Sequence, residues 1–204
     1  MNLSENRILL TGGSGLLGKH LKINADRPSH QELDITKDIL VKKYDLVIHA
    51  AAYTNVEKAE TDEINCFRVN VMGTLRLLKA YPSTPFVYIS SEYAYKPVNF
   101  YSTTKAMAEE LVELHPRHLI IRTLFKPRPW KYPKAFVDQY TMGDYVDVIA
   151  PLIEKTIEEW DGKNKMIYVG TGRKTIYDLA RQTRNVEPIS VNDIKGVRIP
   201  NDYT

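Results

Sequence analysis

Cysteine, long apolar runs and excess charge are all scarce in this sequence. The single cysteine, Cys66, can form neither an intrachain disulfide nor a cysteine-based zinc site, which favours a reducing, cytoplasmic setting. No apolar stretch approaches the roughly 18 residues that a membrane span requires, and no basic segment followed by an apolar one suggests a secretory signal. The net charge of +3 is too small for a dedicated nucleic-acid binder. No histidine or carboxylate grouping has the spacing of metal ligands, so we expect no metal.

The chain does have the composition of one globular domain. Its 204 residues are 43% hydrophobic and 26% charged, which excludes a disordered tail and a coiled coil. Short apolar segments alternate with stretches of helical periodicity, as in a parallel sheet covered by helices on both faces. We therefore predict an α/β fold, a doubly wound parallel sheet of the Rossmann type. The expected strands are Arg7–Thr11, Leu46–Ala50, Phe86–Ser90, Leu119–Arg122 and Ile167–Val169, with a weaker one at Ile23–Arg27.

Helices and irregular segments are expected between these strands. Apolar residues recur every three or four positions in the segments 64–78, 107–114 and 149–160, which predicts amphipathic helices. The stretch from Leu124 to Gly143 carries three prolines and is predicted to be a long irregular loop. Residues 185–204 are also expected to be loosely structured.

A glycine-rich segment directly follows the first expected strand. Thr11-Gly12-Gly13-Ser14-Gly15-Leu16-Leu17-Gly18 fits both GxxGxxG and GxGxxG, and it leads into an apolar helix. Glycines here allow a tight turn, bring backbone N–H groups close to a diphosphate and let the helix approach the strand. The segment therefore predicts a dinucleotide-binding loop, against the alternative of a glycine-rich turn without a ligand.

An acidic residue that holds the adenosine part of a dinucleotide is expected further along the chain. Asp34 lies at a suitable distance from the glycines, although it could also be the N-cap of a following helix. Arg27, Ser29 and His30 follow the weak second strand and could contact a 2′-phosphate. The choice between NAD(H) and NADP(H) stays open on these residues, with a preference for NADP(H).

Tyr101 and Lys105 stand four residues apart, a spacing that places both side chains on one face of a helix. A phenol, with its unperturbed pKa near 10, is a poor acid or base at neutral pH unless a cation such as Lys105 stabilises the phenolate. Ser90 and Ser91 end an expected strand just upstream, where a hydroxyl can hydrogen-bond a substrate carbonyl. A chain with 13 tyrosines produces such a pair easily by chance, but the glycine loop and the serines favour a catalytic pair.

In combination, these motifs resemble the extended short-chain dehydrogenase/reductases, most closely the dTDP-4-dehydrorhamnose reductase group. The resemblance covers most of the chain and is more specific for the superfamily than for one substrate. It is carried by Thr11–Gly18, Glu32–Thr36, Asp45–Glu60, Val69–Thr74, Ile89–Tyr93, Tyr101–Lys105 and Leu119–Thr123, and more loosely by Tyr145–Val148.

The resemblance implies a cofactor site for NADP(H) or NAD(H) and a catalytic trio. Ser91 would be the catalytic hydroxyl, Tyr101 the acid and Lys105 its partner, and the last two would also contact the cofactor. Glu92 stands where this reductase group usually has an aspartate, which keeps the charge but lengthens the side chain. The other implied cofactor residues are Gly12, Ser14, Gly15, Leu16, Leu17, Asp34, Ile35, Ala50, Ala51 and Ala52.

Two parts of the chain depart from the family pattern. The substrate-side loop that the family has between Ser91 and Tyr101 is nearly absent, and the C-terminal part is short. We therefore expect one Rossmann domain over residues 1–204, in which the loop 124–144 and the tail 185–204 form a reduced substrate-binding portion. The cofactor half is expected to be complete.

The remaining candidate residues each have two interpretations. Basic side chains in the irregular loop could attract a substrate diphosphate or simply be solvated, and the aromatic rings there could stack on a sugar or pin the loop down. Asn70 could shape the site or pack a helix, whereas Cys66, His20 and His49 are expected to be packed residues. The loop residues are Lys126, Arg128, Lys131 and Lys134, with Trp130 and Tyr132.

The sequence thus predicts an NAD(P)H-dependent reductase of a keto-sugar nucleotide, in which nicotinamide delivers hydride and Tyr101 supplies the proton. The expected partner is a small-molecule substrate, with neither nucleic acid nor a membrane, and a homodimer is a candidate assembly. Two alternatives stay open. One is a non-catalytic dinucleotide-binding sensor or subunit, and the other is a sugar-nucleotide epimerase or dehydratase with tightly bound NAD.

Overall fold

Five short apolar strands form a parallel sheet in the order β1-β2-β3-β4-β9, in a computed structural model that describes residues 3–202. Every residue of the first three strands is buried, as expected for a sheet covered on both faces. The predicted doubly wound parallel sheet is confirmed. Its strands are β1 (Ile8–Thr11), β2 (Leu46–His49), β3 (Phe86–Ile89), β4 (His118–Arg122) and β9 (Lys165–Tyr168).

The predicted strand at Ile23–Arg27 is reduced to a single bridge between Asp26 and Leu9 on the free edge of β1. Asp26 N donates to Ile8 O at 2.8 Å, and Leu10 N donates to Asp26 O at 2.9 Å. From this edge the chain crosses to β2, on the other side of β1. The order of strands reverses there, so a crevice is expected at the carboxyl ends of β1 and β2.

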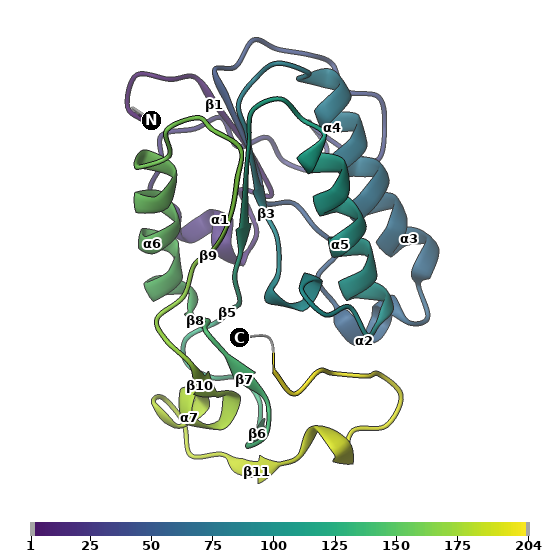
Figure 1. Cartoon of the computed structure of the whole chain (residues 1–204), viewed down its shortest axis with the longest axis vertical. Coiled ribbons are helices and arrows are strands. Elements are labelled where there is room, and N and C mark those ends of the chain that lie inside the picture. Colours follow the sequence, from purple (N-terminus) through teal and green to yellow (C-terminus); the bar gives the residue numbers. More distant parts are fainter. Residues whose placement is uncertain (1–2, 203–204) are drawn as a thin grey trace.

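Helices cover the two faces of the sheet (Figure 1). One face packs against α1 (Leu16–His20) and α6 (Val146–Glu158). The other face carries α4 (Thr74–Ala80) and α5 (Phe100–Glu113). The predicted helix over 64–78 is continuous in the chain, but a π-helical turn interrupts its α-helical hydrogen bonding. Its parts before α4 are α3 (Glu63–Phe67) and η1 (Arg68–Gly73), and the short α2 (Val56–Ala59) precedes them.

The proline-rich stretch from Leu124 to Gly143 is not irregular, which corrects the prediction. It contains β5 (Phe125–Lys126), β6 (Lys134–Phe136) and β7 (Tyr140–Thr141), and the three prolines lie between these strands. Each strand pairs with a segment further along the chain, so local periodicity could not reveal it. The partners are β8 (Asp144–Tyr145), β10 (Lys174–Thr175) and β11 (Glu187–Ile189).

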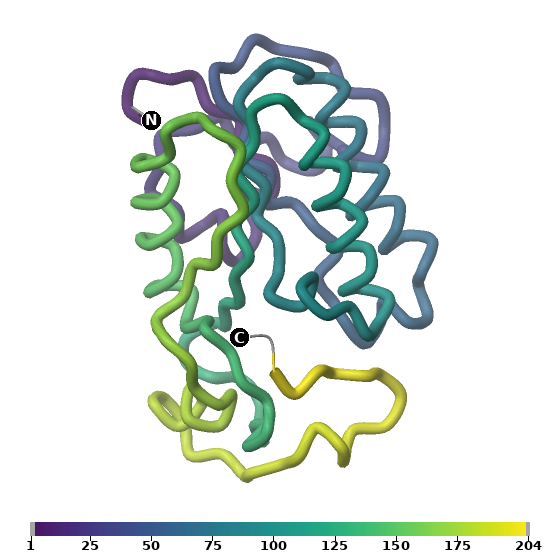
Figure 2. Tube along the Cα trace, in the orientation of Figure 1, coloured from purple at the N-terminus to yellow at the C-terminus, as the bar shows by residue number. Residues whose placement is uncertain are grey.

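These strands, with α7 (Ile176–Arg181) and η3 (Val191–Asp193), form a C-terminal lobe at the carboxyl end of the sheet (Figure 1). The tail is more ordered than predicted, since β11 pairs with β6. The segment beyond η3 then runs back toward the sheet (Figure 2), where Arg198 O accepts from Asn99 Nδ2 at 2.9 Å and Asn201 O from Tyr140 N at 2.7 Å. The tail therefore links the lobe to the start of α5.

Candidate active site

The glycine loop connects β1 to α1 and lies directly against the segment that leaves β2. Gly12 has a φ of +72°, and a Cβ on it would lie 2.6 Å from the backbone N of Ala51. A Cβ on Gly18 would lie 2.6 Å from the Cα of Gly13. Both positions need glycine, the first for its backbone conformation and the second because α1 approaches the loop so closely.

A cavity of about 280 Å³ opens beside this loop, at the carboxyl ends of β1 and β2. The structure therefore brings together residues that are far apart in the sequence but were predicted for one cofactor site. Other predicted residues contribute no wall to it: Leu17 is buried in the core, and Leu16 is exposed. The predicted residues that line the cavity are Gly12, Ser14, Ile35, Ala51 and Ala52.

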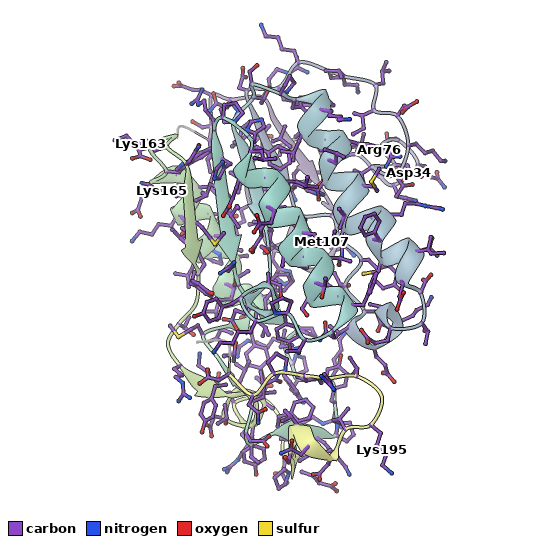
Figure 3. All side chains as sticks on the ribbon, turned by 45° about the vertical axis from the view of Figure 1, so that its right-hand side comes forward. Asp34, Arg76, Met107, Lys163, Lys165 and Lys195 are labelled. Carbon is purple, nitrogen blue, oxygen red and sulfur yellow. The ribbon has the colours of Figure 1, made fainter. Side chains whose placement is uncertain are left out.

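Asp34 lines a second cavity of about 630 Å³, which shares part of its wall with the first. Its carboxylate accepts hydrogen bonds from Thr36 N at 2.9 Å and Thr36 Oγ1 at 2.7 Å, and these bonds lower the pKa of Asp34. No helix begins here, so the N-cap alternative is wrong, and Asp34 instead stabilises a turn. In Figure 3 Asp34 lies on the side of α4, opposite Lys165 on β9.

The Arg27 guanidinium is already engaged at the end of α1. It donates to the carbonyl oxygens of Gly18, Leu21 and Ile23, the last two at 2.7 and 2.8 Å. A contact between Arg27 and a 2′-phosphate would require breaking these bonds. His30, by contrast, is exposed and lines both cavities.

The start of α5 is set by a capping box, which positions the tyrosine and the lysine. Asn99 Oδ1 accepts from Ser102 N at 2.8 Å, and Ser102 Oγ accepts from Asn99 N at 3.1 Å. The helix consequently begins at Phe100, before the apolar periodicity that starts at Met107. Tyr101 and Lys105 then occupy its first two turns and are both buried.

Tyr101 lies beside Ser91, which follows β3, and its ring packs edge-on against Tyr93 with ring centroids 6.4 Å apart. Burial raises the pKa of Tyr101 to about 12, and hydrogen bonding to Ser91 offsets only part of that rise. The phenol is therefore protonated at neutral pH. A protonated phenol is what the predicted role of Tyr101 as the acid requires, although burial, and not the charge of Lys105, dominates the shift of its pKa.

The Lys105 side chain is 2% exposed and reaches under the end of β3. Its Nζ donates to Ile89 O at 3.0 Å and lies 4.2 Å from the centre of the Tyr88 ring. Burial lowers the pKa of Lys105 to about 7, while the charge of Glu109, one turn further along α5, acts in the opposite direction. An amine is thus held inside the fold one turn from Tyr101, in surroundings whose burial disfavours its charged form.

Glu92 faces the C-terminal lobe and has a structural role. Its carboxylate accepts hydrogen bonds from Thr141 Oγ1 at 2.6 Å and Met142 N at 3.1 Å, and it is fully buried. Burial raises the pKa of Glu92, with these hydrogen bonds opposing the rise. The longer side chain in place of an aspartate therefore joins the segment after β3 to the lobe.

Asn70 lies in the π-helical turn η1, a type of turn that is frequent at functional sites, and it contacts Tyr53, which lines the first cavity. Its Oδ1 accepts from Tyr53 N at 2.8 Å, and its Nδ2 donates to Thr104 Oγ1 at 3.0 Å. Asn70 thereby fixes the segment that leaves β2 to α5. Cys66 is buried next to this pair, as predicted, and burial raises the pKa of its thiol.

Two of the four basic residues in the proline-rich stretch have local partners. Arg128 pairs with Asp147 at 2.9 Å, and Lys134 pairs with Glu187 at 3.7 Å. Trp130 is buried in the lobe and donates from Nε1 to a backbone carbonyl at 3.3 Å, so its role is to pin the segment down. Lys126 and Lys131 form no ion pair within residues 3–202, and Lys126 is half-buried on β5.

The ion pair between Glu109 and Arg122 was not predicted from the sequence. The spacing of one helical turn between Lys105 and Glu109 is a signal that could have pointed to Glu109. Within residues 3–202, no group of histidine, cysteine and carboxylate side chains could hold a metal ion. No helix in the same range is long and apolar enough to cross a membrane.

Comparison with known proteins agrees with these observations. The family model described as RmlD substrate binding domain matches residues 6–150. A dTDP-4-dehydrorhamnose reductase of Mycolicibacterium smegmatis is 30% identical over 152 residues, 60% of this chain and 46% of that protein. A GDP-6-deoxy-D-mannose reductase of Pseudomonas aeruginosa is 35% identical over 129 residues, 55% of this chain and 41% of that protein. The chain spans about half the length of the curated relatives it matches.

Solved structures share the fold. A dTDP-4-dehydrorhamnose reductase of Clostridium acetobutylicum superposes with a TM-score of 0.84 at 23% identity, covering 97% of this chain and 89% of that one. The Bacillus anthracis dTDP-4-dehydrorhamnose reductase in complex with NADP gives a TM-score of 0.81 at 23% identity, with coverages of 100% and 90%.

Proposed function

This chain belongs to the RmlD substrate binding domain family, and on that premise we propose that it is an NAD(P)H-dependent reductase of a keto group on a nucleotide-linked sugar. One observation carries the proposal. A buried, protonated Tyr101 lies beside Ser91 and one helical turn from a buried Lys105, at the end of the sheet where the glycine loop also lies. This is the set of groups that a carbonyl reduction needs.

The residues around the first cavity suit a dinucleotide. The glycines leave no side chain between the loop backbone and the phosphates of a ligand, and α1 has no side-chain cap on its first N–H groups. Ser90 Oγ, at the end of β3, is buried without a hydrogen-bond partner in the described part of the chain. When bound, NAD(P)H supplies a hydride to the substrate carbonyl carbon.

The proton that completes the reduction comes from Tyr101. Negative charge develops on the carbonyl oxygen, and Ser91 Oγ donates a hydrogen bond that orients this oxygen. With a pKa of about 12, the Tyr101 phenol is protonated at neutral pH and is more acidic than an alcohol, so transfer to the developing alkoxide is favourable. The charge of Lys105 then stabilises the phenolate that remains.

The relatives support the substrate class, because they are named as reductases of dTDP- and GDP-linked sugars. The chain spans about half the length of these relatives, so their substrates do not transfer to it directly. The proposal therefore includes a nucleotide-sugar substrate, a cytoplasmic location and a homodimer. The C-terminal lobe faces the end of the sheet where Tyr101 lies, and the two share one apolar cluster. The lobe is thus the part of the chain that would hold the sugar.

The test is Tyr101→Phe, with NADPH oxidation followed on dTDP- and GDP-linked 4-keto sugars. Loss of the acid is expected to lower turnover by about 10²–10⁴-fold, while NADPH binding stays within about twofold. Tyr93→Phe is the matched control, because it removes a hydroxyl from the neighbouring buried ring and leaves the proton donor in place. Full activity of Tyr101→Phe would disprove the assignment.

Two further outcomes identify other functions. Tight NADPH binding without oxidation across the whole panel would favour a sensor or subunit. NAD that survives purification, with no net oxidation, would favour an epimerase or dehydratase.

A further inference from the structure

A buried ion pair continues the row of functional side chains along α5. Tyr101, Lys105 and Glu109 follow one another at intervals of one helical turn, and all three are buried. The Glu109 carboxylate accepts three hydrogen bonds from Arg122, at 2.6 Å from Nη2 and at 3.0 and 3.2 Å from Nε. Arg122 ends β4, so the carboxylate is fixed to the sheet as well as to its own helix.

The guanidinium in turn is held by two aromatic rings. Arg122 lies 5.8 Å from the ring centre of Tyr95 and 5.7 Å from that of Tyr168, and its Nη1 donates to Tyr168 Oη at 3.1 Å. These rings come from the segment after η2 and from β9. Three separate parts of the fold therefore hold one carboxylate in position one helical turn from Lys105.

The other titratable groups that face Lys105 are neutral at pH 7. His49, from β2, has its pKa lowered to about 3 by burial and by the charge of Lys105. Burial raises the pKa values of Tyr88 from β3 and Cys66 from α3, so the phenol and the thiol stay protonated. Tyr101 is protonated as described above. Among the described groups that act on Lys105, Glu109 is ionised, and its negative charge is shared with the Arg122 guanidinium that pairs with it.

We propose that Glu109, fixed by Arg122, is a positioning residue that keeps the Lys105 ammonium protonated inside the fold. Desolvation disfavours a buried ammonium, and a carboxylate one turn away is the available compensation. The significance of this role rests on the proposed reductase function, because only a charged Lys105 can stabilise the Tyr101 phenolate. An ion pair that merely joined α5 to β4 would stabilise the fold but would leave the protonation of Lys105 unchanged.

The test measures Lys105 directly in the full chain without substrate. The ε-position signal of Lys105 in isotope-labelled protein, assigned with Lys105→Met, is titrated by NMR in wild type, Glu109→Gln, Glu109→Asp and Asp144→Asn. Asp144→Asn is the matched control, since it neutralises a buried carboxylate that pairs with Lys174 at 3.4 Å in the C-terminal lobe. The midpoint in Glu109→Gln is expected to fall by one unit or more, which makes the protonated fraction at pH 8 about tenfold smaller.

Glu109→Asp keeps the charge but withdraws it by one methylene, so its midpoint is expected between those of wild type and Glu109→Gln. If Glu109→Gln does not fold, the Asp variant carries the test alone. An unchanged Lys105 midpoint in the Gln or Asp variant overturns the proposal, as does an equal shift in Asp144→Asn.

A second readout links Lys105 to the reaction. The pH profile of turnover in Glu109→Gln is expected to fall at lower pH than in wild type, and its activity to approach the wild-type value near pH 6. Failure of the reductase proposal looks different. In that case the Lys105 midpoint still shifts, but no variant, including wild type, oxidises NADPH.

Discussion

Replacing Gly18 by alanine tests whether close packing of α1 on the glycine loop is what builds the cofactor site. The new Cβ would lie 2.6 Å from the Cα and 2.7 Å from the carbonyl carbon of Gly13, against 3.4 Å or more in ordinary contact. The crowded atoms are backbone, so α1 and the loop must separate by roughly 1 Å, and overpacking of this kind costs about 1–3 kcal/mol. For a chain of this size the melting temperature is expected to fall by about 2–12 °C.

The effect on the cofactor is the decisive part of this prediction. Separation of α1 from the loop displaces the backbone N–H groups that would bind a diphosphate, so the Kd for NADPH is expected to rise at least about tenfold, or ~1.4 kcal/mol. Calorimetry or NADPH fluorescence measures this Kd well below the melting temperature.

Gly170→Ala is the matched control for crowding. Gly170 follows β9, at the edge of the sheet opposite β1. A Cβ on Gly170 would lie 2.7 Å from the carbonyl carbon of Met142. The melting temperature of Gly170→Ala is expected to fall similarly, while the Kd stays within about twofold of wild type. Wild-type affinity in Gly18→Ala, or an equal loss in both variants, would refute the reasoning.

Two further predictions concern buried polar groups beside the site. His49 is buried and neutral between Thr11 and Thr74, with a pKa of about 3, whereas the unfolded chain protonates it near pH 6.5. The free energy of unfolding should therefore fall as pH decreases from about 6.5 toward 3, by up to about 1.4 kcal/mol per pH unit from this residue, and urea titrations of His49→Gln should lack that part of the slope. Asn70→Ala should lower the free energy of unfolding by about 1–3 kcal/mol and weaken NADPH binding. The control Asn65→Ala, at an exposed position earlier in the same helical segment, should change the free energy of unfolding by less than about 0.5 kcal/mol. Equal effects of the two substitutions would contradict the role given to Asn70.

The positions of Tyr101 and Lys105 depend on a local signal at the start of α5. Asn99 and Ser102, three positions apart in the sequence, form a capping box that fixes where α5 begins and therefore which turn carries Tyr101. The burial that raises the pKa of Tyr101 comes instead from Tyr93 and from the C-terminal lobe. The position of Tyr101 is therefore set by residues close in sequence, whereas its pKa is set by residues distant in sequence.

The sequence by itself determined the parallel sheet, the glycine loop and the helical spacing of Tyr101 and Lys105. Strand apolarity, the freedom of glycine and the helical repeat act over a few residues, so the order of residues is enough to express them. The same holds for the segments after β1 and β2, whose residues the sequence predicts for one cofactor site and whose side chains line one cavity.

Only the tertiary structure decided which charges the site holds. The strand pairs of the C-terminal lobe, the engagement of Arg27 at the end of α1 and the placement of Arg122 against Glu109 all join residues distant in sequence. The protonation of Tyr101 and Lys105 likewise follows from desolvation, which depends on everything packed around a group. Desolvation and long-range pairing exist only once the chain has folded, and no local pattern encodes them.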